Sequence, residues 1–399
     1  LFMLVDKPHM NLFQDLFLSK YRKTHLMTLP SESNSETIFY IDSTAVLKNL
    51  ITFRDILPKD HKIMAMIKAN AYGLGAIIIA NLLEKNNVNY FGVAHTNEGE
   101  ELRLAGITTP IMVMNPGEKS FGKMLAQNLE PQIYSWESLE KYTEVLTNSD
   151  ESIFQGKIHI KIDTGMGRLG FKISDADLLI NQLNMSPSIK VISLMSHLPS
   201  AESPKEDPFT KNQGKIFNSF CDKIEKGLGY SCIRHISNTA ATERHPNLRG
   251  DMVRLGIGLF GYNPVIDSKL SLLPVAYLRS KVSHIHKISK GDSISYGRDY
   301  ISDGDRKIAT IPIGYADGFS RVLSNGVGKV SFNGKFFPVV GRVCMDMTMI
   351  DISDSDIIVG DEVEVFGKDI LLKDFSELCR TSPYEALARI SSRIKRIQF

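Results

Sequence analysis

Lys68 stands in a sequence setting that could make its amine reactive. It follows the apolar run Met64-Ala65-Met66-Ile67 and precedes residues 69–73, so it stands at the carboxyl end of a predicted strand. Apolar neighbours desolvate a lysine, which lowers the pKa of its amine and frees it as a nucleophile for a carbonyl carbon. A solvated lysine at a strand edge is the ordinary alternative. The chemistry therefore depends on what surrounds this lysine.

Two later segments have the composition of a phosphate site. Ser237-Asn238-Thr239-Ala240 follows one predicted strand, and Gly256-Ile257-Gly258 lies near the end of another. Glycine lets backbone N–H groups approach a phosphate closely, and a threonine hydroxyl adds a donor. Each segment alone is more often an ordinary turn. Together with a nucleophilic lysine they indicate pyridoxal phosphate, held as a Schiff base.

Short β-rich runs alternate with helix-length segments between residues 38 and 260. The predicted strands are 62–68, 90–94, 111–114, 132–134, 157–162, 190–195, 233–237 and 252–255. Eight βα units close a TIM-type (β/α)8 barrel, whose active site lies at the carboxyl ends of its strands. A doubly wound open sheet is the alternative, because such a strand count is uncertain by about one or two. Asp207 is predicted to cap a long helix, with Pro208 at its first position.

The remainder of the chain follows a different pattern. From Val275 to Gly367, apolar and polar residues alternate between turn signals, which is typical of an antiparallel β domain. We therefore expect a barrel over residues 36–265 and a β-rich domain over residues 266–399. The first strand, 39–42, is a candidate for pairing with the second domain. One last helix is expected at 383–391.

Residues 1–35 are predicted to be an N-terminal extension. Apolar residues at 12, 13, 16, 17 and 21 have helical spacing, and a polar linker follows at 31–36. Asp15 and Lys20 interrupt what would have to be the apolar region of a secretory signal. Met27 is a candidate start within this segment.

Composition excludes several classes of protein. The 399 residues are 43% apolar and 23% charged, and a net charge of +2 creates no strong field for nucleic acid or anionic membrane. No apolar run is long enough to span a membrane. Four cysteines without a C-x-x-C pair carry no zinc or redox signature, and we expect no metal site. They are typical of reduced thiols in a cytoplasmic protein, with a Cys221–Cys232 disulfide as the lesser alternative.

Seven segments, in order, resemble motifs of the alanine racemase family. They are residues 65–75, 161–170, 254–257, 295–297, 313–318, 341–346 and 383–385. The resemblance covers residues 36 to 399 and implies a (β/α)8 barrel followed by a β domain. It also implies a pyridoxal-phosphate enzyme that interconverts L- and D-alanine by a two-base mechanism, as a homodimer with shared active sites. In a bacterium the D-alanine would supply cell-wall peptidoglycan.

The resemblance implies a role for each matching residue of the catalytic centre. Lys68 would carry the cofactor and act as one base, and Tyr296 of the other subunit would be the opposite base. Arg254 would face the pyridine nitrogen, and His197 would sit between Arg254 and Tyr296. Lys161 matches a lysine that is carbamylated in several family members, where it positions the arginine matching Arg168.

Further matching residues would bind the cofactor and the amino-acid substrate. The phosphate would be held by Tyr72, Thr239, Gly256, Ile257 and Tyr384. Arg168 would approach the ring hydroxyl, and Arg168 and Met345 would contact the substrate. The entrance would be lined by Glu202, Tyr315, Arg321 and Arg342.

The sequence departs from the family pattern near the entrance. Leu74 stands where the family usually has histidine, and residues 196–202 replace a segment that usually ends in aspartate. Glu202 keeps that charge on a side chain one methylene longer, and Pro199 stiffens the loop. These differences bear on entrance geometry and substrate preference, and they leave every direct catalytic role occupied.

Three other functions are alternatives to alanine racemisation. A serine racemase or a racemase of broader specificity would need the same residues. A pyridoxal-phosphate decarboxylase family resembles this domain arrangement, but it places an acidic residue against the pyridine nitrogen, where this chain has Arg254. Single-barrel relatives bind the cofactor without enzymatic activity and lack the second domain that carries Tyr296.

Overall fold

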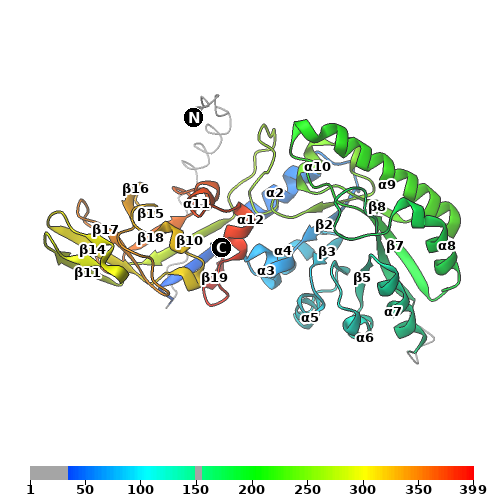
Figure 1. The fold of residues 1–399 in the computed structure, drawn as a ribbon, viewed down its shortest axis with the longest axis horizontal. Helices are drawn as coiled ribbons and strands as arrows, with labels where there is room; N and C mark the ends of the chain where they lie inside the picture. Colours follow the sequence, from blue (N-terminus) through cyan, green and yellow to red (C-terminus); the bar gives the residue numbers. More distant parts are fainter. Residues whose placement is uncertain (1–34, 149–154) are drawn as a thin grey trace. The chain divides into compact units, whose positions relative to one another are not determined.

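The computed structural model describes residues 35–148 and 155–399 of the chain (Figure 1). They form two compact units. One comprises residues 49–268 with 387–389, and the described residues of the other are 35–48, 269–386 and 390–399. The helical stripe and Met27 lie outside the described residues, as do residues 31–34 of the predicted linker.

The first unit is built on eight strands. They are β2 Lys62–Met66, β3 Tyr90–Val93, β4 Ile111–Val113, β5 Leu129–Ile133, β6 Gly156–Lys161, β7 Ile189–Met195, β8 Ile233–His235 and β9 Met252–Leu255. The hydrogen-bonded order is β8-β7-β6-β5-β4-β3-β2-β9, and each of these pairs is parallel. The Arg254 N–H donates to the Ser237 carbonyl at 3.0 Å and so brings β9 beside the end of β8. The predicted barrel is confirmed, and the open sheet is excluded.

Helices alternate with these strands, and α5 to α9 lie outside the ring of strands in Figure 1. The helices are α2 Ser43–Asp55, α3 Lys68–Tyr72, α4 Ala76–Glu84, α5 Thr96–Leu104, α6 Phe121–Ala126, α7 Trp136–Thr147, α8 Ala176–Asn184, α9 Asp207–Leu228 and α10 Thr239–Arg244. The prediction that Asp207 caps α9 is wrong. A 3-10 turn precedes α9, Glu206 takes the cap position, and the Asp207 carboxylate accepts a 2.9 Å hydrogen bond from Arg244 instead.

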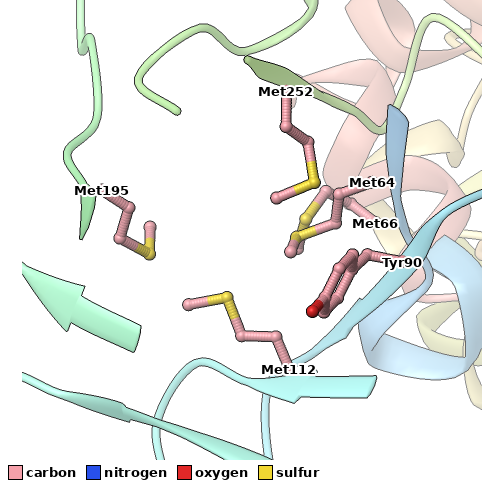
Figure 2. Packing of buried hydrophobic residues seen from close by; sticks show 6 residues of the cluster. All are labelled: Met64, Met66, Tyr90, Met112, Met195 and Met252. Atoms are coloured by element: carbon pink, nitrogen blue, oxygen red, sulfur yellow. The ribbon is translucent and has the colours of Figure 1, made fainter. Parts of the chain in front are cut away.

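One part of the barrel interior is filled by sulfur-containing side chains. Figure 2 shows Met64, Met66, Tyr90, Met112, Met195 and Met252 converging from strands β2, β3, β4, β7 and β9. Methionine fills irregular gaps because its unbranched side chain is flexible and its sulfur is polarisable. Gly92 makes room for this packing, since a Cβ there would lie 2.7 Å from the Met66 Sδ.

The other part of the interior is polar. Strands β5 to β9 each contribute a buried polar side chain to it, namely Glu130, His159, Ser193, His235 and Arg254. Residues two apart on a strand share a face. His159 therefore lies on the same face as Lys161, at the carboxyl end of β6. The polar part of the barrel interior therefore reaches the carboxyl ends of the strands, where catalytic groups are expected.

The second unit contains a six-stranded sheet of order β16-β15-β18-β10-β1-β19 and a three-stranded sheet of order β11-β14-β17. The first consists of β1 Thr37–Ile41, β10 Ala276–Lys281, β15 Lys329–Phe332, β16 Lys335–Pro338, β18 Glu362–Phe366 and β19 Lys395–Gln398. The second consists of β11 His284–Ile288, β14 Arg306–Ile311 and β17 Thr348–Asp351. The pairs are antiparallel except β1 with β19. β1 therefore belongs to this sheet, not to the barrel.

Short elements complete the second unit. β12 Ser293–Ile294 and β13 Tyr300–Ile301 form a two-stranded ladder around a 3-10 turn at Tyr296–Arg298. α11 Leu372–Leu378 and α12 Pro383–Ala388 precede β19. Over residues 35–148 and 155–399, none of the helices combines the length and the hydropathy that a membrane span requires.

Candidate active site

Lys68 lies at the start of a left-handed turn. Ala69, Asn70, Ala71 and Tyr72 all have φ between 52° and 56°. This conformation costs an L-residue about 1–2 kcal/mol, so four in succession require strong support from their surroundings. The Glu98 carboxylate accepts a 2.6 Å hydrogen bond from the Ala69 N–H and a second 2.6 Å bond from the Ala94 N–H. Glu98 thereby ties the turn after Lys68 to the end of the neighbouring strand.

The surroundings of Lys68 disfavour the protonated form of its amine. Burial lowers its pKa, and the nearby guanidiniums of Arg168 and Arg254 lower it further, against the opposing effect of Glu98. A lower pKa increases the fraction of neutral amine near pH 7. Neutral amine is the form that attacks a carbonyl and accepts a proton.

Arg254 lies in the barrel and is only 3% exposed. Its Nη1 donates to the Nδ1 of His235 at 3.0 Å and to the His235 carbonyl at 2.9 Å. Its Nη2 donates to the Ser196 and Ile236 carbonyls at 2.7 and 3.0 Å and to the Nδ1 of His197 at 3.2 Å. The described residues engage both terminal nitrogens and leave the Nε–H for another acceptor. Burial lowers the pKa of Arg254 to about 10, so it stays charged at neutral pH.

His197 and Lys161 experience the same positive field. Burial lowers the pKa of His197 well below its usual value, and Arg254, Lys161, Arg168 and Lys68 add to this effect. Burial, Arg254 and Arg168 likewise lower the pKa of Lys161 to about 7. Since Arg254 can only donate, the neutral imidazole of His197 accepts at Nδ1 and carries its proton on Nε2. The barrel end therefore holds two lysines that lose a proton easily and one neutral histidine.

Arg168 lies on an exposed loop whose shape depends on Asp163. The Asp163 carboxylate accepts the N–H groups of Gly165 and Gly167 at 3.0 and 3.1 Å. Gly170 has φ of 127°, and a Cβ there would lie 2.6 Å from the Asp163 nitrogen. Only glycine fits this close approach, so the sequence folds the loop back on strand β6 and holds Arg168 beside the lysines.

Three groups form a polar cradle next to Lys68. The Tyr72 hydroxyl lies so close to Gly256 that a Cβ on Gly256 would be 2.4 Å from it. The Gly256 N–H donates to the Thr239 hydroxyl at 3.3 Å. Burial raises the pKa of Tyr72 to about 12, so its phenol remains a donor. This cradle, which a side chain on Gly256 would fill, fits a phosphate, and the next residue, Ile257, is buried.

Tyr296 lies in the second unit and is 69% exposed. It follows Ser295, whose φ is 67°, and precedes Gly297, whose φ is 74°. The Ser295 hydroxyl donates to the Arg342 carbonyl at 2.6 Å, and the Arg342 guanidinium donates to both Asp299 oxygens, one at 3.0 Å. Arg342 therefore holds the turn that presents Tyr296.

Tyr315 and Met345 lie side by side in the same unit. The N–H groups of Tyr315 and Ala316 donate to the Cys344 and Met345 carbonyls, both at 3.0 Å. A Cβ on Gly314 would lie 2.3 Å from the Met345 oxygen, so only glycine permits this contact. Beneath it, buried Asp317 accepts two bonds from Arg393, which also donates to Asp346 at 2.7 Å.

The remaining predicted residues are distributed over both units. Glu202 follows strand β7 in the barrel unit and is partly buried. Arg321 is exposed on a 3-10 turn of the second unit, and Tyr384 lies on α12. Leu74 is fully buried beside the left-handed turn. The barrel unit thus gathers Lys68, Tyr72, Lys161, Arg168, His197, Thr239, Arg254 and Gly256, whereas Tyr296, Tyr315, Met345 and Arg342 gather in the second unit.

Several supporting residues were not predicted from the sequence. Glu98, Asp163, Asp317 and Arg393 hold the loops that carry predicted residues. Glu98, Asp317 and Arg393 act on segments that only the folded chain brings near, whereas Asp163 acts on its own loop. His159 was detectable, because its spacing of two from Lys161 places both on one face of a strand.

Comparisons with known proteins point to one family over nearly the whole chain. Residues 41–264 match the family model described as alanine racemase, N-terminal domain, and residues 275–398 match alanine racemase, C-terminal domain. An alanine racemase of Clostridium tetani is 38% identical over 369 residues, which are 90% of this chain and 94% of that protein.

Two solved structures are similar in fold as well as in sequence. Alanine racemase of Clostridium difficile has a TM-score of 0.87 and 36% identity, covering 92% of this chain and 97% of its own. The alanine racemase of Bartonella henselae, solved with covalently bound pyridoxal phosphate, has a TM-score of 0.81 and 28% identity. That match covers 92% of this chain and all of the Bartonella chain.

Proposed function

The chain belongs to the alanine racemase family and interconverts L- and D-alanine, and we propose that it does so with pyridoxal phosphate and two bases from different subunits. The observation that carries this proposal is the barrel end at which a lysine of lowered pKa, a buried arginine and a polar cradle come together. In a bacterium, the D-alanine so formed supplies peptidoglycan.

The residues of the barrel unit fit the cofactor. When bound, pyridoxal phosphate supplies an electron sink that stabilises negative charge on the Cα of an amino acid. Lys68 would hold it covalently, Arg254 would donate its Nε–H to the ring nitrogen, and Arg168 would approach the ring hydroxyl. Tyr72, Thr239, Gly256 and Ile257 would hold the phosphate, with Tyr384 of α12. The 2.4 Å approach of the Tyr72 hydroxyl to the Cβ position of Gly256 supports that cradle.

Two residues move protons in the proposed reaction. Inverting a carbon centre by proton transfer requires a base on one face and an acid on the other. Substrate exchange frees the Lys68 amine, whose lowered pKa lets it accept a proton from Cα. We assign the opposite face to Tyr296, whose exposed hydroxyl belongs to the unit that carries no cofactor lysine. The Nε2–H of His197 would orient that phenol.

A homodimer supplies both bases to one site. Tyr296, Tyr315, Met345 and Met347 are each more than 40% exposed, although they are large and largely apolar. Such side chains are enriched where a partner covers them. We propose that this surface meets the barrel of a second copy, where Met345 contacts the substrate with Arg168. Glu202, Tyr315, Arg321 and Arg342 would then line the entrance.

Lys161 is proposed to be carbamylated. Its neutral amine attacks carbon dioxide, a nitrogen–carbon bond forms, and one proton is released. The guanidiniums of Arg254 and Arg168, which disfavour an ammonium at this position, favour the resulting anion. Because the pKa of Lys161 is lowered to about 7, the amine is neutral above pH 7 and protonated below it.

We expect one carbamate signal in the ¹³C NMR spectrum of the protein in labelled bicarbonate at about pH 8, and its loss at about pH 6. Lys161→Ala should remove the signal. Lys157→Ala, at an exposed position of the same strand, should keep it. A signal that survives Lys161→Ala, or none at about pH 8, would refute carbamylation of this lysine.

The proposed function is tested with L-alanine and pyridoxal phosphate. We expect optical rotation to decay to zero without release of carbon dioxide, because racemisation conserves the carboxylate and decarboxylation does not. L-serine and other L-amino acids should be compared under the same conditions. Carbon dioxide release would indicate a decarboxylase, a faster rate with L-serine would reassign the substrate, and no reaction with any amino acid would contradict an enzymatic function.

A further inference from the structure

A continuous series of short contacts crosses the barrel interior below Arg254. His235 Nε2 lies 2.8 Å from the Ser193 hydroxyl, and that hydroxyl lies 2.6 Å from His159 Nδ1. His159 Nε2 lies 2.9 Å from a Glu130 carboxylate oxygen. Five consecutive strands, β5 to β9, contribute one residue each. The four polar residues below Arg254 are at most 3% exposed.

The direction of each hydrogen bond follows from the donors and acceptors available. A guanidinium has no acceptor, so Arg254 donates to His235 Nδ1, which is therefore unprotonated. Burial lowers the pKa of His235 well below its usual value, and Arg254 adds to this, so the ring is neutral with its proton on Nε2. His235 Nε2–H then donates to Ser193.

The remaining bonds continue in the same direction. Ser193 has one hydroxyl proton, and His235 cannot accept it, so His159 Nδ1 is its acceptor in the series. His159 then carries its proton on Nε2 and donates it to Glu130. Burial alone would raise the pKa of Glu130, but its bond with His159 and the charge of Lys157 lower it overall, so it is an acceptor at neutral pH.

The surroundings make this direction costly to change. Tyr90, which belongs to the methionine cluster of Figure 2, packs edge-on against His159 with ring centroids 5.8 Å apart. Burial and the nearby Glu130 carboxylate raise the pKa of Tyr90, so its phenol stays protonated. In such a low-dielectric interior an unpaired polar group is costly, and linked hydrogen bonds strengthen one another. Lys157 meets the same carboxylate from the exposed side at 3.6 Å.

We propose that Glu130 is a positioning residue for Arg254, and that it acts through a one-directional chain of hydrogen bonds formed by His159, Ser193 and His235. The chain fixes the neutral state and the tautomer of His235, which in turn holds Nη1 of Arg254. The guanidinium is thereby oriented with its Nε–H available. That this Nε–H meets the ring nitrogen rests on the proposed function, whereas the chain itself does not.

The tautomers are tested by nitrogen NMR of the cofactor-loaded enzyme labelled with ¹⁵N-histidine. His159→Gln and His235→Gln assign the signals. We expect both rings to be neutral, protonated on Nε2 and unprotonated on Nδ1. A doubly protonated His159, forming an ion pair with Glu130, would overturn the proposal, as would a proton on Nδ1 of His235. Neither outcome depends on racemase activity.

The positioning role is tested by substitutions at Glu130. Glu130→Leu removes the final acceptor, and we expect altered His235 signals, a shifted absorbance of the bound cofactor and a kcat about tenfold lower or more. Glu130→Gln keeps an acceptor oxygen, and Arg254 still sets the direction, so tautomers and kcat should stay near wild type. Lys157→Met is the matched control, because it removes only the exposed partner of Glu130. It should change neither the histidine tautomers nor kcat.

Unchanged His235 signals and kcat in Glu130→Leu would show that Glu130 does not position Arg254. If Glu130→Leu fails to fold, the wild-type tautomers and Glu130→Gln still decide the proposal. Loss of activity in Glu130→Gln with intact tautomers would also overturn it, because charge rather than direction would then be the requirement.

Discussion

Replacing Lys68 with alanine is expected to abolish the covalent cofactor link and to lower racemisation by at least about 10³-fold. In the proposed mechanism, the substitution removes both the nucleophile that holds pyridoxal phosphate and one of the two bases, each of which contributes substantially to rate. Borohydride treatment should label a single peptide in wild type, the one containing Lys68, and none in the variant. The visible absorbance of the lysine-bound cofactor should disappear when no amine is added.

Lys62→Ala provides the matched control. Lys62 is exposed at the start of β2, the strand that ends two residues before Lys68, and should be dispensable for both label and activity. Because the left-handed turn at 69–72 is held by Glu98 and by backbone bonds, Lys68→Ala should remain folded. A borohydride-reducible link on another lysine in Lys68→Ala would refute the assignment of Lys68 as the lysine that binds the cofactor.

Replacing Tyr296 with phenylalanine is expected to leave the cofactor bound and to slow racemisation by at least about 10²-fold. The variant loses the phenol to which the proposal assigns proton transfer on one face, whereas Lys68, assigned to the other face, is untouched. In D₂O, one alanine enantiomer should still exchange its Cα hydrogen with retention of configuration. Exchange without inversion separates loss of one base from general damage to the site.

Tyr300→Phe controls for the loss of a phenol in the same segment. Tyr300 lies on β13 and packs with the apolar cluster around Ile294, so its ring is structural. The Tyr300→Phe variant should retain the wild-type rate of racemisation. Racemisation by Tyr296→Phe at the wild-type rate in both directions would remove Tyr296 from the mechanism.

The sequence predicted the barrel because βα alternation is a local pattern, and it placed Lys68 correctly at a strand end. It did not predict the left-handed turn that follows. Alanine at 69 and 71 disfavours φ near 52°, and only contacts such as the Glu98 bond to the Ala69 N–H overcome that preference. Strand β5 also begins at Leu129, not Gln132, because Pro131 interrupts the expected pattern.

The sequence pointed to candidate site residues where they lie in motifs, and it did not point to the residues that support them. Glu130, Ser193 and His235 lie on different strands, and their bonds depend on the register of the barrel. Asp207 shows the same limit, since its local cap signal yields to a tertiary bond with Arg244. Local propensity is a weak guide wherever a charged side chain finds a distant partner.

The central claim, that each active site combines Lys68 of one chain with Tyr296 of another, is tested most directly by subunit complementation. Lys68→Ala and Tyr296→Phe proteins, each nearly inactive, are mixed in equal amounts under conditions that exchange subunits. About half of the dimers should then be mixed, each with one doubly altered and one intact site, so about a quarter of wild-type activity should return. No recovery, despite mixed dimers demonstrated by mass spectrometry, would place both residues in one chain's site and contradict the shared-site account.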